Sequence, residues 1–155
     1  MKTKTTIVTL AFSVLAAAAC FAESPQMGKW TLNEAKSKLD PTMGKNTTVI
    51  YSAAKGDKTK VEVTGVDKDG KPTHSVWVGK FDGKFYPVKG NLAYNQVMYK
   101  MVNDRTNAIS AMKDDKVLWT GEIAVAKDGK SRTVTVNGTD AAGKKFQNKA
   151  VYDKS

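Results

Sequence analysis

The sequence predicts an all-β fold, an up-and-down antiparallel meander of about ten strands closed into a barrel. Three observations predict it. Short runs of β-branched and aromatic residues follow one another closely, Asp-Gly steps separate several of them, and apolar and polar residues alternate within them. No segment after the first connection shows a helical period, so we expect consecutive hairpins without long crossovers.

The strands are expected in quick succession along the chain. The first covers 28–32, and in the polar connection that follows, residues 33–38 suit one helical turn before Asp40-Pro41 stops it. The other strands are expected at 47–53, 60–66, 72–79, 84–88, 96–102, 108–113, 117–126, 132–137 and 146–152.

The turns between these strands carry signals of their own. Asp69-Gly70, Asp82-Gly83 and Asp128-Gly129 are Asp-Gly steps, which tolerate the positive φ of tight hairpins. Residues 63–71 and 136–144 share the pattern V-x-G-x-D-x-x-G-K. Two explanations stay open for this repeat, an internal duplication and the reuse of one favourable hairpin turn.

Alternation within the strands assigns their faces. Val134 and Val136 share one face of their strand, and Thr133 and Thr135 share the other. Strands with one buried and one wet face suit a closed barrel or an open sandwich. Closure removes the exposed edges of the sheet, which favours the barrel.

Residues 1–22 have the features of a signal peptide, and the folded domain is expected at 23–155. Lys2 and Lys4 precede an apolar stretch that is too short to span a bilayer, and Cys20 and Ala22 are small residues suited to cleavage before Glu23. The mature protein is then periplasmic or secreted, has no transmembrane segment and contains no cysteine for a disulfide.

Cys20 offers an alternative to ordinary cleavage. The stretch Ala17-Ala18-Ala19-Cys20 loosely resembles a bacterial lipobox, in which Cys20 becomes a lipidated N-terminus. Under this alternative the protein is anchored to the outer membrane through Cys20.

The chain is strongly basic, with a net charge of +10 that becomes +8 when Lys2 and Lys4 leave with the signal peptide. Arg105 and Arg132 are the only arginines, and the lysines are scattered rather than clustered. Proteins that bind nucleic acid group Arg and Lys on one face and interleave aromatic residues. We therefore expect no nucleic-acid partner. The charge serves solubility or, alternatively, contact with an anionic envelope surface.

The residues of the mature chain do not form a catalytic or metal-binding pattern. His74 is the only histidine, and Ser75 beside it in a strand faces the opposite way, so the two cannot form a nucleophile–base pair. One histidine without cysteine does not suit a zinc site, and Asp67-x-Asp69 lacks the further ligands of a calcium loop. We expect no enzyme activity, no metal and no cofactor.

The two ends of the mature chain resemble known families. Gly28-Lys29-Trp30 resembles the G-x-W that opens the first strand of lipocalins, and residues 30–37 are similar to the W-x-L-N-x-x-K-S opening of small, exported, uncharacterised bacterial proteins. The resemblance implies a lipocalin-like barrel with Trp30 at its closed end and Arg132 stacked over it. At the other end, Val151-Tyr152-Asp153-Lys154 resembles the last strand of intracellular fatty-acid carriers. The chain departs from these carriers, because Ala150 stands where their final-strand R-x-Y motif has arginine.

Four aromatic residues in the middle strands are the candidate ligand-binding residues. They are Trp77, Phe85, Tyr99 and Trp119. They suit the wall of a ligand cavity and, equally, a packed core. From them we expect a lipocalin-like binding protein for a small apolar or amphipathic ligand. The alternative is a structural or interaction module of the envelope whose lysine-rich surface meets anionic partners.

Overall fold

The fold is all-β, as the sequence predicts. The structure, a computed structural model, describes residues 23–140 and 142–155, so the predicted signal peptide and Cys20 lie outside the described residues. These described residues form ten strands: β1 (Gly28–Leu32), β2 (Lys45–Ala54), β3 (Lys58–Val66), β4 (Pro72–Gly79), β5 (Asp82–Gly90), β6 (Gln96–Asn103), β7 (Thr106–Lys113), β8 (Lys116–Val125), β9 (Ser131–Thr139) and β10 (Lys145–Lys154). Every strand expected from the sequence is confirmed, and the expected helical turn is the 3₁₀ turn η1 (Glu34–Lys36).

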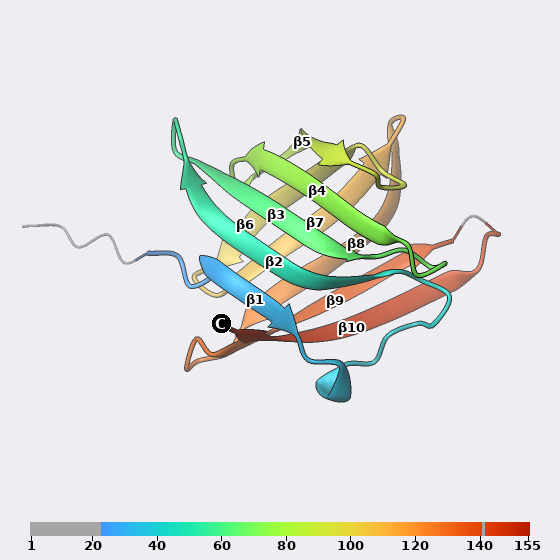
Figure 1. The fold of residues 1–155 in the computed structure, drawn as a ribbon. Coiled ribbons are helices and arrows are strands. Elements are labelled where there is room, and N and C mark those ends of the chain that lie inside the picture. The colour runs from blue at the N-terminus through green and yellow to red at the C-terminus, as the bar shows by residue number, and fades with distance from the viewer. Residues whose placement is uncertain (1–22, 141) are drawn as a thin grey trace, which may run out of the picture.

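The strands form one antiparallel meander that closes into a barrel (Figure 1). Each strand pairs with the next along the chain, and β1 closes the ring by pairing with both β2 and β10. Closure excludes the open sandwich that the strand pattern also allowed. Trp30 pairs with Val49 on one side and with Lys154 on the other, so the G-x-W segment lies at the seam of the barrel.

The barrel interior is filled mainly by apolar and aromatic side chains. Along β2, Val49 and Tyr51 are buried while Ile50 between them is 37 % exposed, which is the alternation expected of a strand with one buried face. The same inward face on the other strands carries the buried residues Trp30, Val61, Trp77, Val97, Tyr99, Ile109, Ala111, Ile123, Val125, Ala150 and Tyr152.

The repeated sequence pattern forms the same turn twice. The Asp67 side chain accepts hydrogen bonds from the amides two and four residues later, and Asp140 does the same. Gly70 and Gly143 occupy equivalent positions with φ of 77° and 81°, which glycine adopts without strain. The two segments therefore form the same type of hairpin turn at two places in the chain.

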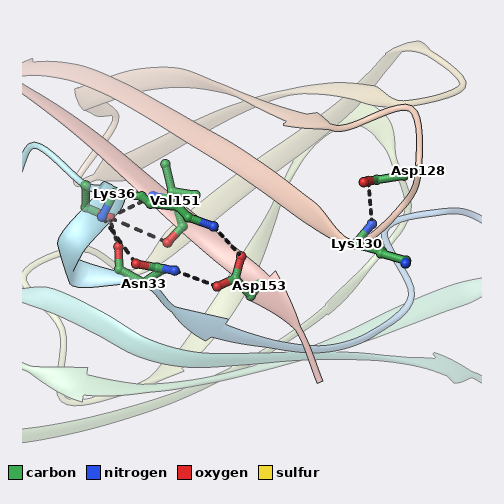
Figure 2. A network of polar contacts seen from close by, with 7 residues as sticks. Asn33, Lys36, Asp128, Lys130, Val151 and Asp153 are labelled. Atoms are coloured by element: carbon green, nitrogen blue, oxygen red, sulfur yellow. Dashed lines mark hydrogen bonds and ion pairs between the residues drawn. The ribbon is translucent and has the colours of Figure 1, made fainter.

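The end of the W-x-L-N-x-x-K-S segment forms hydrogen bonds that join the connection after β1 to β10 (Figure 2). Asn33 donates through Nδ2 to Asp153 Oδ2 at 2.6 Å and accepts at Oδ1 from the Lys36 amide. The Ser37 hydroxyl donates to the Asn33 carbonyl at 2.7 Å and accepts from the Val151 amide at 2.9 Å. Lys36 Nζ also lies 3.7 Å from Asp153 Oδ1, so the Asn, Lys and Ser of the motif all contact β10.

Residues 23–140 and 142–155 contain no helix long and apolar enough to cross a membrane.

Candidate functional site

Two of the four predicted site residues, Trp77 and Tyr99, meet inside the barrel. Trp77 on β4 is 2 % exposed and Tyr99 on β6 is 5 % exposed, and their ring centroids lie 4.6 Å apart. Phe81 lies 6.1 Å from Trp77 and 5.3 Å from Tyr99, and Tyr86 lies 5.7 Å from Trp77. We call these four residues, Trp77, Phe81, Tyr86 and Tyr99, the aromatic cluster. Edge-to-face contacts of this kind stabilise a packed aromatic group beyond the area that it buries.

The Trp77 indole is held by a hydrogen bond as well as by packing. Its Nε1 donates to the Val97 carbonyl at 3.0 Å. The small residue Gly79 leaves the space that the two neighbouring rings occupy, since a Cβ at this position would lie 2.5 Å from Trp77 and 2.7 Å from Tyr86. The position of the aromatic cluster therefore depends on a glycine two residues further along the same strand.

Phe85 projects from the other face of its strand. Successive residues of a strand face opposite sides, and Tyr86, the next residue, is the one that contacts Trp77. Phe85 pairs across the sheet with Met98, the neighbour of the buried residues Val97 and Tyr99. The inward aromatic residue of β5 is thus Tyr86, and Phe85 is not part of the aromatic cluster.

Trp119 belongs to a second group of aromatic residues. Tyr94, from the connection between β5 and β6, meets Trp119 of β8 edge to face at 5.4 Å. Burial raises the pKa of the Tyr94 phenol to about 12. Tyr94 lies in no strand, and sequence reasoning missed it because strand alternation says nothing about a loop residue.

Arg132 stacks over Trp30, which confirms the expectation drawn from the lipocalin resemblance. The guanidinium carbon lies 4.8 Å from the centroid of the Trp30 ring, 4.9 Å from Tyr51 and 5.1 Å from Tyr152. Trp30 itself is fully buried and donates from Nε1 to the Gln26 carbonyl at 2.8 Å. Three ring faces thus surround one cation, a favourable arrangement in a desolvated site.

The Arg132 guanidinium is poorly provided with hydrogen-bond acceptors. The side chain is 2 % exposed, yet within the described part of the chain no carboxylate lies at ion-pair distance from it. Its Nη1 donates to Gln26 Oε1 at 3.4 Å, and its buried Nε has no partner among the described residues. An arginine side chain keeps its charge in proteins, so the interior of the barrel holds a positive charge that no carboxylate of residues 23–140 and 142–155 pairs with at ion-pair distance.

Four tyrosines converge on this part of the interior, and we call them the tyrosine cluster: Tyr51, Tyr94, Tyr99 and Tyr152. Burial, and secondarily the adjacent Tyr51 phenol, raises the pKa of Tyr99 well above its usual value, while the nearby Arg132 charge opposes the shift. Burial likewise raises the pKa of Tyr152 to about 12, again against the effect of Arg132. At neutral pH these phenols are uncharged, and each can donate a hydrogen bond.

The sequence carried a signal for part of the tyrosine cluster. Tyr51 follows Val49 with the period of two that marks the buried face of β2, and Tyr152 follows Ala150 in the same way on β10. Reading the inward face of all strands together would have placed these two residues in the interior with Tyr99. Nothing in the sequence indicated Gln26, which lies before the first strand.

Two surface hollows lie where strands end. One is lined by Asn103, Asp104, Arg105, Thr106, Val125 and Lys127, and the other by Asn137, Gly138, Thr139, Lys145, Phe146 and Gln147. Neither is lined by Trp77, Phe85, Tyr99 or Trp119. The described residues also contain no group of three or more His, Cys, Asp or Glu side chains placed to hold a metal ion, and His74 is exposed on β4.

Comparison with known proteins adds no further assignment. No protein-family model matches this chain, and no curated protein matches it.

Proposed function

We propose that the protein is an exported, lipocalin-like binding protein that holds a small apolar or amphipathic molecule inside the barrel. The observation that carries the proposal is the chemistry of the interior, where two groups of aromatic rings lie beside a few polar donors. Small-molecule sites are typically lined by apolar and aromatic side chains with a small number of convergent polar groups.

The Tyr94–Trp119 contact is the part of the interior best suited to admit a ligand. Tyr94 is contributed by a loop, so moving it away from Trp119 separates no pair of strand residues. The aromatic cluster, in contrast, is attached to strands through Trp77, Tyr86 and Tyr99. A ligand that replaces the Tyr94 ring against Trp119 would keep the apolar surface of the indole covered.

A titration with a neutral apolar probe tests the proposal. N-phenyl-1-naphthylamine becomes fluorescent in apolar surroundings, and we expect it to bind the wild-type protein at one saturable site. Trp119→Ala should weaken that site about tenfold, because a large aromatic contact surface is lost. Phe85→Ala on the outer face is the matched control and should leave the affinity unchanged. Equal losses in both variants, or no saturable binding of either this probe or an anionic analogue of it, would contradict the proposal.

The lysine-rich exterior favours a second candidate, an envelope module that contacts anionic surfaces. Exposed lysines occur on strands and turns around the barrel and include Lys55, Lys58, Lys71, Lys80, Lys84, Lys89, Lys100, Lys113 and Lys116. Such contact predicts sedimentation with vesicles that contain phosphatidylglycerol, and loss of that binding as salt is added. Binding inside the barrel should change little with salt, so the two candidates are separable.

A further inference from the structure

We propose that the interior site selects organic anions, and that the negative group of the ligand binds at Arg132 within the tyrosine cluster. This inference rests on the proposed function, since it assigns a charge to the ligand of the same barrel. It does not use the final-strand motif of fatty-acid carriers, which this chain lacks. The arginine comes instead from β9 and lies opposite Tyr152 of β10 in the strand register.

The first argument is the balance of charge. Arg132 is buried, and the described residues offer it no carboxylate at ion-pair distance. An isolated buried charge is costly, and proteins usually pair it or neutralise it. Ring faces offset part of this cost, but they accept no hydrogen bond in the plane of the guanidinium, where its N–H groups point.

The second argument is the balance of hydrogen-bonding groups. The guanidinium only donates, and among the described residues Gln26 Oε1 is the one acceptor that bonds it, while its buried Nε has none. The Gln26 contact is long at 3.4 Å, and the Tyr152 hydroxyl donates to Asn46 at 3.1 Å. Phenols donate as well as accept, so the nearby hydroxyls can also donate to a ligand group that only accepts, and carboxylates and sulfonates are such groups.

Gln26 occupies the position that an anionic group would take. Its side-chain oxygen faces Arg132 Nη1, while its amide nitrogen donates to the Arg105 carbonyl at 3.3 Å, another long contact. Both bonds are at the weak end of the range for N–H···O contacts. A ligand anion that displaces the Gln26 amide would exchange a weak neutral acceptor for a charge-assisted one.

A matched pair of probes tests the charge preference. 1-Anilinonaphthalene-8-sulfonate and N-phenyl-1-naphthylamine share one aromatic skeleton and differ in the sulfonate. We expect the anionic probe to bind the wild-type protein about tenfold more tightly than the neutral probe, because hydrogen bonds to charged groups are the stronger ones. The preference should persist in added salt, since a buried pair is screened less than surface lysines are.

Two variants locate the preference at Arg132. Arg132→Met should abolish it while neutral-probe binding remains. Because this variant could fail to fold, Gln26→Glu provides a second, nearly isosteric test: its carboxylate should occupy the anion position and weaken the anionic probe about tenfold. Gln147→Glu places the same charge on the exposed face of β10 and should change nothing.

The outcomes separate the two proposals. Equal binding of both probes, unaffected by Gln26→Glu, overturns the anion inference and leaves the binding function standing. Failure of both probes to bind overturns the proposed function. An anion preference that disappears with salt, or that Gln147→Glu reduces as much as Gln26→Glu does, assigns the charge effect to the lysine-rich exterior and also overturns the inference.

Discussion

Replacing Trp77 with phenylalanine tests the aromatic cluster most directly. The indole is 2 % exposed, donates a hydrogen bond to the Val97 carbonyl and contacts three other rings. The lost hydrogen bond costs about 1 kcal/mol. The smaller ring removes about 40 Å² of buried apolar surface, worth about 1 kcal/mol, and the cavity left behind adds about 1 kcal/mol. The free energy of unfolding should therefore fall by about 3 kcal/mol.

The assay is urea denaturation followed by far-ultraviolet circular dichroism, with Trp119→Phe as the matched control. Trp119 is only partly buried, and no side-chain hydrogen bond joins it to the described residues, so its replacement should cost about 1 kcal/mol. The dependence of the unfolding free energy on urea should stay the same in both variants, because the barrel itself persists. A Trp77→Phe protein as stable as Trp119→Phe would refute the packing described for the aromatic cluster.

Four further results are expected. Gly79→Ala should lower the unfolding free energy by about 2 kcal/mol in urea, because its Cβ collides with two rings; an unchanged midpoint would contradict the tight fit. Ser37→Ala should lower the free energy of unfolding by about 1 kcal/mol, because it removes the hydroxyl that bonds the Val151 amide of β10. An unaltered melting temperature would argue against that role. Asp140→Ala should lower the free energy of unfolding by about 1 kcal/mol, because it removes a carboxylate that accepts hydrogen bonds from two backbone amides. Equal stability in thermal melts would contradict the role of this side chain in the turn. The pKa of Tyr152 is raised to about 12, so the folded state keeps a proton that the unfolded state releases near its ordinary pKa of about 10. The free energy of unfolding should therefore fall as pH rises through this interval, and it should fall less in Tyr152→Phe. Phenolate absorbance that rises fully near pH 10 would contradict the burial of the phenol.

The strand order was accessible from the sequence because local signals agreed with one another. Asp-Gly steps and alternating apolar residues place each hairpin without reference to distant parts of the chain. Closure of the barrel is different, because it depends on β1 pairing with β10 from the other end of the sequence. The alternation pattern allowed a barrel or a sandwich, and the register between these two strands decides between them.

The inward-facing residues of β5 could not be predicted from the sequence alone. The pairing of β5 with β6 is irregular between Asp82 and Phe85, so alternation cannot be counted through from the Asp-Gly turn. As a result Tyr86, rather than Phe85, joins Trp77. A shift of one residue exchanges the faces of a strand, and no local property of Phe85 or Tyr86 indicates which of them faces the interior.

The polar part of the interior was also only partly predictable. The lipocalin resemblance led to the stacking of Arg132 on Trp30, but it did not indicate that the described part of the chain would place no carboxylate at ion-pair distance from the guanidinium. That property depends on which residues of distant strands and loops come together in three dimensions. Gln26 and Tyr94 both lie outside the strands, where neither alternation nor turn chemistry assigns a direction to a side chain.

Native mass spectrometry of the protein, purified from the envelope fraction of the cells that produce it, tests the central claim most directly. The claim is that the barrel carries a small molecule in its interior. A discrete additional mass that disappears on denaturation, and that is retained in high salt, is the predicted result, and its composition should include an acidic group. A bare polypeptide from fresh envelope material that also fails to take up either naphthalene probe would contradict the account.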